Sequence, residues 1–175
     1  MKKAVCFTMT LVMIFVLCSC MKGVSTVLFG DRDNELADAR MEQLFDVLKL
    51  HNNDAVKELF SGRAAGNAED LDGCIDRLRS FVQGEVVSWD REESPMVYDS
   101  TEAGGKTKRL VTWYTLDTEE QTYLVLLVDY PIDTIDPQNA GLYAILVLRA
   151  EDESKLEGTW EDWVIPGVSI LEDPL

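Results

Sequence analysis

In the part of the chain after residue 32, His51 and Cys74 are the only histidine and the only cysteine, residue types that support nucleophilic or metal chemistry. His51 is the only histidine of the chain, and serine and cysteine hydrolases use a histidine as general base. It falls where the apolar spacing predicts the end of a helix, a position at which a protonated imidazole favours the helix dipole. Cys74 falls on the apolar face of another predicted helix, so we expect a buried, unreactive thiol. Zinc needs three or four ligands, so one histidine and one cysteine do not predict a metal site. The sequence also singles out no catalytic residue and no cofactor.

Acidic and amide side chains gather in one predicted loop region that contains Asp129, Asp133, Asp136 and Asn139. Calcium prefers oxygen ligands of these types. The spacing does not match the EF-hand loop, and a solvated loop has the same composition, so we expect a solvated loop. The 32 acidic residues also allow carboxylate pairs of the kind that glycosidases use, but the sequence singles out none of them.

Aromatic residues on predicted strands are the remaining candidates for a binding site. A curved sheet under helices encloses a cone-shaped space, and such spaces are frequent ligand sites. Trp113, Tyr123 and Tyr143 are the residues expected to line it. Core packing is the ordinary explanation for aromatic residues on strands, and both interpretations stay open at this point.

Cys20 is the residue with the clearest predicted chemistry. Lys2 and Lys3 precede an apolar segment at residues 4–17, which is short for a membrane-spanning helix of about 20 residues. The segment Leu17-Cys18-Ser19-Cys20 resembles the lipobox of bacterial lipoproteins, with a small residue directly before the cysteine. We expect residues 1–19 to be a signal peptide and the thiol of Cys20 to carry the lipid, because two acyl chains suffice for stable anchoring.

The charge of the chain limits its partners. It has 16 basic and 32 acidic residues, and removal of Lys2 and Lys3 with the signal peptide leaves 14 − 32 = −18. Such a surface repels phosphate backbones, so nucleic acid is not an expected partner. It also repels anionic headgroups, so contact with the membrane requires the covalent anchor. We expect a location on the extracytoplasmic side of the cell membrane, with a protein or small-molecule partner that the sequence does not identify.

The apolar spacing predicts helices in the first half of the chain. After a tether at residues 20–32, Asp33 or Asn34 is the expected cap of a helix with Ala37, Met41, Leu44, Phe45 and Leu48 on one face. Asn53 is expected to cap a short second helix that Ser61-Gly62 ends. Asn67 is expected to cap a third helix, which runs through Leu71 and Leu78 to a stop at Gly84.

Strand patterns fill the second half, and we expect residues 33–175 to form a single domain. The expected strands are 85–90, 95–100, 109–116, 121–130, 142–149 and a last one over 160–170 that Pro166-Gly167 interrupts. Helices followed by strands joined by short turns predict an α+β fold, with N-terminal helices packed on one face of a curved antiparallel sheet.

This order of elements resembles the cystatin-like or NTF2-like fold, and the chain is similar to the lipoproteins grouped as DUF5104. The residues that carry the resemblance are Cys20 with its lipobox, the first helix through Phe45, and the segments 123–129, 136–142 and 163–167. The resemblance implies a fold and a location at the membrane. It implies no catalytic residue.

Three functions follow as hypotheses. The first is a membrane-anchored, non-catalytic binding or interaction module. The second is an NTF2-like enzyme, of isomerase or hydrolase type, with a carboxylate of raised pKa inside the cone. The third is an accessory that docks on another envelope protein through an exposed apolar patch.

Overall fold

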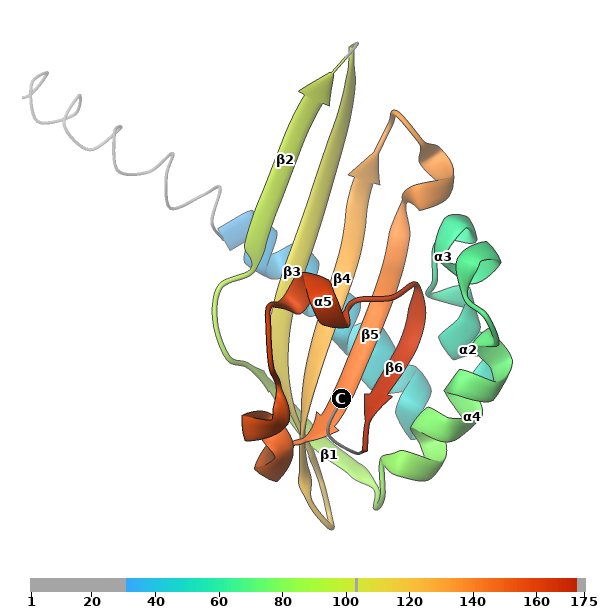
Figure 1. The fold of residues 1–175 in the computed structure, drawn as a ribbon, viewed down its shortest axis with the longest axis vertical. Helices are drawn as coiled ribbons and strands as arrows, with labels where there is room; N and C mark the ends of the chain where they lie inside the picture. Colours follow the sequence, from blue (N-terminus) through green and yellow to red (C-terminus); the bar gives the residue numbers. More distant parts are fainter. Residues whose placement is uncertain (1–30, 103, 173–175) are drawn as a thin grey trace, which may run out of the picture.

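Helices come first and strands follow, as the apolar spacing predicts (Figure 1). The computed structural model describes residues 31–102 and 104–172; the predicted signal peptide and Cys20 lie outside this range. The helical elements are the N-terminal helix (residues 31–49), α2 (Asn53–Glu58), α3 (Gly62–Asn67), α4 (Leu71–Phe81), η1 (Pro137–Asn139), η2 (Ala150–Lys155) and α5 (Trp160–Trp163). The strands are β1 (Val86–Arg91), β2 (Met96–Glu102), β3 (Gly105–Thr118), β4 (Thr122–Asp133), β5 (Gly141–Arg149) and β6 (Gly167–Leu171).

The N-terminal helix is already formed at residue 31, so neither Asp33 nor Asn34 is its cap. Asp33 instead forms an ion pair with Lys108 on β3. The helix therefore includes the last two residues of the predicted tether. Its apolar face is the predicted one, with Ala37, Met41, Leu44 and Leu48 buried and Phe45 partly buried.

Capping residues define the short helices. Asn52 caps α2 through a bond from the backbone N–H of Ala55. Ser61 was expected to end the helical region, but it starts α3 instead. Its hydroxyl accepts a hydrogen bond from the backbone N–H of Ala64 at 3.1 Å. Asp70, rather than Asn67, caps α4.

The strands form one curved, open sheet in the order β1-β3-β4-β5-β6. β1 and β2 pair with successive parts of the same edge of β3. All pairs are antiparallel except β5 and β6, which are parallel.

The prediction of a last strand over residues 160–170 is wrong in its first half. Residues 160–163 form α5, because the carboxylate of Asp162 accepts hydrogen bonds from the backbone N–H of Thr159 at 2.9 Å and from its hydroxyl at 3.1 Å. The chain thereby crosses the sheet on the side opposite the N-terminal helix (Figure 1). Gly167, with φ +97°, then starts β6 beside β5.

The two faces of the sheet carry separate apolar cores. The helices cover one face, where Tyr114, Leu116 and Tyr123 are at most 1% exposed. On the other face, the segment from η2 to β6 covers a smaller cluster around Leu126 and Leu146. None of the helices within the described residues has the length and apolarity to cross a membrane.

Candidate functional site

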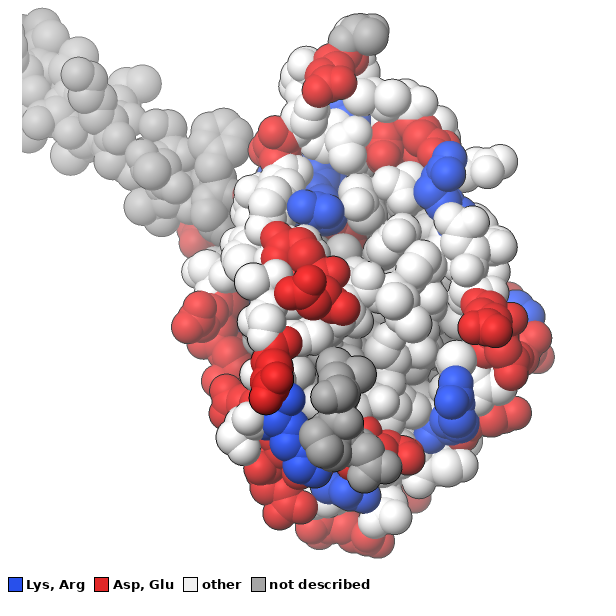
Figure 2. Space-filling view, in the orientation of Figure 1, with Lys and Arg blue, Asp and Glu red and all other residues white. Residues whose placement is uncertain are grey.

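The face of the sheet opposite the helices, here called the open face, is apolar but incompletely covered. Alternate residues of β3, β4 and β5 point to this side, among them Val111, Val128 and Leu146. Trp163 reaches back onto it and meets Trp113 edge to face, with 6.4 Å between ring centroids. In Figure 2 uncharged surface extends over the middle of this face, beside an acidic group at the position of α5, and further acidic residues lie around the margin. The open face therefore combines accessible apolar area with a charged rim.

A groove of about 590 Å³ lies on the open face between α4, β6 and the segment that contains α5. Leu146, Trp163 and Val168 contribute apolar surface to it. Arg77 adds one positive charge, whereas four acidic residues, Asp162 among them, add negative charge. Small-molecule sites have volumes of about 300–1,000 Å³ and are mostly apolar with a few polar groups, so the groove has the size and chemistry of such a site.

Cys74 lines the same groove and is partly buried, not fully buried as predicted. Arg77, one turn further along α4, donates a hydrogen bond from Nη2 to its Sγ at 2.9 Å. The prediction of a core thiol therefore holds only in part, because the residue lies at the edge of the helix face that packs on the sheet.

A second hollow, of about 460 Å³, lies on the other side of the segment 156–163. Trp113, Met96 and Leu124 line its base. Glu92, Glu93 and Glu153 contribute three carboxylates. The charge of this hollow suits a cationic rather than an anionic ligand.

The structure does not bring Trp113, Tyr123 and Tyr143 together around one cavity. Trp113 faces the open side, where it lines the second hollow. Tyr123 lies in the core under the helices, where its hydroxyl donates to the carbonyl of Phe81 at 2.8 Å. Tyr143 is partly buried and packs against Tyr130, with ring centroids 5.7 Å apart. Trp113 on β3 is opposite Leu126 on β4, so these two side chains share a face of the sheet. Side chains alternate along a strand. Tyr123, three residues before Leu126, therefore points to the other face.

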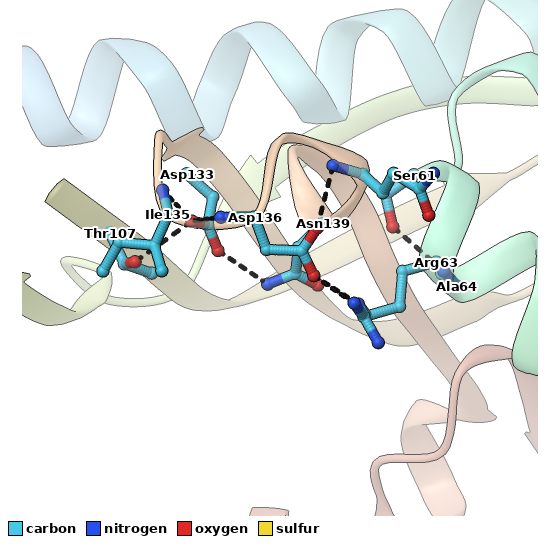
Figure 3. A network of polar contacts seen from close by, with 9 residues as sticks. Ser61, Arg63, Ala64, Thr107, Asp133, Ile135, Asp136 and Asn139 are labelled. Carbon is cyan, nitrogen blue, oxygen red and sulfur yellow. Dashed lines mark hydrogen bonds and ion pairs between the residues drawn. The ribbon is translucent and has the colours of Figure 1, made fainter. Parts of the chain in front are cut away.

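The predicted loop after β4 is ordered by Asp133, as Figure 3 shows. Its carboxylate accepts hydrogen bonds from the backbone N–H groups of Ile135 at 3.0 Å and Asp136 at 2.8 Å, from Asn139 at 3.1 Å and from Thr107 at 3.2 Å. These bonds, led by the one from Asp136, lower the pKa of Asp133. Arg63 on α3 forms an ion pair with Asp136.

The same contacts give the loop a structural role rather than a calcium site. A calcium ion needs oxygen lone pairs directed at one point, whereas the oxygens of Asp133 are directed at N–H and O–H donors. Within residues 31–102 and 104–172, no group of three or more His, Cys, Asp or Glu side chains has the geometry to hold a metal ion.

The sequence suggested that Asp129 belongs to this loop. The structure places it on the buried face of β4 instead. It is 4% exposed and pairs with Arg40 of the N-terminal helix, with 2.8 Å between Nε and Oδ1. Burial raises its pKa, and the opposing effect of Arg40 is smaller. The alternation Tyr123, Val125, Leu127, Asp129 was the sequence signal that places it on the helix side. Neither the groove nor the second hollow is lined by Asp129.

His51 lies just beyond the N-terminal helix, as predicted, in a left-handed backbone conformation with φ 51°. Its imidazole is exposed, 3.2 Å from Nη1 of Arg79 and 3.9 Å from a carboxylate oxygen of Glu85. The described structure places no serine or cysteine nucleophile in hydrogen-bond contact with it.

Comparison with protein families gives a match over residues 43–150 to the family described as Domain of unknown function (DUF5104). The chain belongs to this family. The DUF5104 match begins within the N-terminal helix and ends just after β5, so it includes the Asp133 loop but not Trp163 or β6. No curated protein matches the chain.

Proposed function

We propose that this DUF5104 protein is a lipoprotein, anchored through Cys20 on the extracytoplasmic side of the membrane, that binds a small apolar molecule without transforming it. The groove beside Trp163 is the proposed site. The single observation that supports binding is the presence of about 590 Å³ of accessible, mainly apolar space on the open face.

The proposed fold type is cystatin-like or NTF2-like, with helices packed on a curved, mainly antiparallel sheet. In this chain the space between helices and sheet is occupied by side chains such as Tyr114, Leu116 and Tyr123. Ligand binding is therefore assigned to the open face instead of the cone interior.

Binding can be tested with 2-naphthylmethanol, a neutral aromatic alcohol, added to the lipidated protein in phosphatidylcholine nanodiscs. Ligand-observed NMR measures its affinity against empty nanodiscs. Ser169 lines the groove, so Ser169→Phe should fill it and weaken binding at least tenfold. Ser100→Phe is the matched control, because Ser100 is exposed on β2, and it should bind as the unmodified protein does. Equal binding by the two variants would remove the groove from the proposal.

Anchoring can be tested with radiolabelled palmitate and membrane fractionation. Cys20→Ser should abolish labelling and release the protein from membranes, because the thiol is the proposed acylation site. Cys18→Ser is the control and should remain labelled and bound. A Cys20→Ser protein that keeps its label and its membrane association would contradict the assignment of the anchor to Cys20.

The second candidate function is an NTF2-like isomerase or hydrolase, and the raised pKa of Asp129 is the observation that favours it. Such an enzyme needs a path for substrate to this carboxylate. Carbodiimide with glycinamide at neutral pH, followed by peptide mass spectrometry, measures that access. Modification of Asp129 in the folded protein would favour the enzyme, and protection of Asp129 alongside modified surface carboxylates would favour the binding module.

A further inference from the structure

Within the described residues, Arg109 on β3 has no polar partner, although the protein is strongly acidic. Its side chain lies on the open face and is half-buried, and its Nε is completely buried without a hydrogen bond. Within the described part of the chain, no ion pair or hydrogen bond involves its guanidinium. An unsatisfied buried donor is unfavourable, so this arrangement needs an explanation.

Two aromatic rings hold the guanidinium. Its central carbon lies 4.3 Å from the ring centroid of Tyr98 on β2 and 5.1 Å from that of Trp160 on α5. The two ring centroids are 5.8 Å apart and the rings are tilted by 53°, so the arginine lies in a corner between them. We call Tyr98, Arg109 and Trp160 the aromatic corner. Cation–π contacts orient the guanidinium but use its faces, not its N–H donors.

Other half-buried arginines of the chain show the contrast. Arg40 pairs with Asp129 at 2.8 Å, Arg91 with Asp38 at 2.7 Å. Carboxylates are abundant in this chain, with 32 acidic residues, yet none lies within ion-pair distance of Arg109 in the described structure. The Nη donors of Arg109, unlike its buried Nε, are thus left without a protein acceptor in the described structure.

We infer that the aromatic corner is a binding site for a carboxylate group of the ligand. A guanidinium presents its N–H donors in a fork that matches the two oxygens of a carboxylate. The two rings exclude water from one side of the pair, which strengthens the attraction. The net negative charge of the protein is screened beyond about 8 Å at physiological salt, and within the described residues no carboxylate lies within ion-pair distance of the guanidinium.

This inference rests on the proposed function and adds a chemical class to it. Trp160 and Trp163 are the first and last residues of α5, so the aromatic corner and the groove lie at the two ends of the same four-residue helix. The ligand is then an acid with an apolar body: a free small carboxylic acid or the C-terminus of a peptide.

The test compares 2-naphthylacetate with its neutral amide, 2-naphthylacetamide, on the lipidated protein in phosphatidylcholine nanodiscs. The acid should bind at least tenfold more tightly than the amide. Arg109→Gln should abolish this preference. Lys106→Gln is the matched control, because Lys106 is an exposed residue of the same strand and its loss changes the net charge equally; the preference should persist. Equal binding of acid and amide, or an acid preference that survives Arg109→Gln, would overturn the inference.

A second arm distinguishes the sources of the carboxylate. The peptide acetyl-Ala-Ala-Phe is offered with a free or an amidated C-terminus. A peptide acid that binds more tightly than 2-naphthylacetate identifies a chain terminus as the ligand, and weaker peptide binding identifies a free small acid. Failure of the inference differs from failure of the proposed function: in the first case 2-naphthylmethanol still binds, and in the second it does not.

Discussion

Asp133 is the residue whose replacement most directly tests our interpretation of the loop after β4. The perturbation is Asp133→Ala, with Asp133→Asn as the isosteric comparison. Asp133 is 9% exposed, and its carboxylate accepts the backbone N–H groups of Ile135 and Asp136 at 3.0 and 2.8 Å. The side chains of Thr107 and Asn139 can turn to water after its removal, whereas the direction of the two backbone donors is fixed by the loop.

The expected loss of stability follows from these two bonds. A hydrogen bond to a charged group contributes about 1.5–3 kcal/mol, so Asp133→Ala should lower the free energy of unfolding by about 3 kcal/mol. Asp133→Asn keeps one acceptor oxygen but loses the charge and directs an amide at Asn139, so its loss should be smaller, about 1–2 kcal/mol.

The effect should depend on pH. The hydrogen bonds, first that from Asp136, lower the pKa of Asp133 in the folded protein from its ordinary value of 3.8. A carboxylate with a lowered pKa stabilises the fold fully above its unfolded pKa, and this stabilisation is lost as the pH falls through the folded pKa. The difference between the protein and Asp133→Asn should therefore be constant near pH 7 and shrink below about pH 4.

Urea unfolding followed by far-ultraviolet circular dichroism measures these differences, with all variants in the same detergent. Glu119→Ala is the control, since Glu119 is an exposed acidic residue in the turn after β3 and its loss should change stability by less than about 0.5 kcal/mol. An Asp133→Ala protein as stable as the control, or a difference that grows as the pH falls below 4, would refute the assigned role of these bonds.

Three further predictions concern the backbone, the core and the groove. Gly141→Ala should cost about 2 kcal/mol in urea unfolding, because φ is +125° and a Cβ would lie 3.2 Å from neighbouring backbone; Gly66→Ala, in open space, should be neutral or stabilising. Asp129 has a raised pKa, so its contribution to stability is lost as the pH rises through that pKa. Asp129→Asn stays neutral and should therefore gain stability relative to the unmodified protein between pH 4 and pH 7. A relative loss would mean that the attraction of Arg40 dominates. Asp162→Ala removes the cap of α5 and should weaken 2-naphthylmethanol binding several-fold, whereas Glu161→Ala should not.

Elements with a long apolar repeat were predictable from the sequence. The buried face of the N-terminal helix is one such case, and the strands around Leu126 and Leu146 are another, because burial on one or both sides imposes a period that the sequence must show. Boundaries were less predictable. Asp33 has the type of a cap, but an ion pair with Lys108, 75 residues away, determines its role.

Short elements and the candidate sites depended on contacts that a sequence does not display. α3 has six residues and α5 four, too few to establish a period, although Ser61 and Thr159 are recognisable caps. Pairing of β6 with β5 in parallel requires the chain to cross the open face first. The aromatic corner combines residues from β2, β3 and α5, so the alternation of β3 predicts the direction of Arg109 but not its neighbours.

The N-terminal helix is attached to three different strands by ion pairs: Arg91 of β1 with Asp38, Lys108 of β3 with Asp33, and Asp129 of β4 with Arg40. In Figure 1 this helix runs diagonally behind the sheet. With the proposed anchor at Cys20, any mechanical pull from the bilayer enters the domain through this helix and is shared among the three strands at once. The load is then distributed over three strands instead of acting on one edge strand alone.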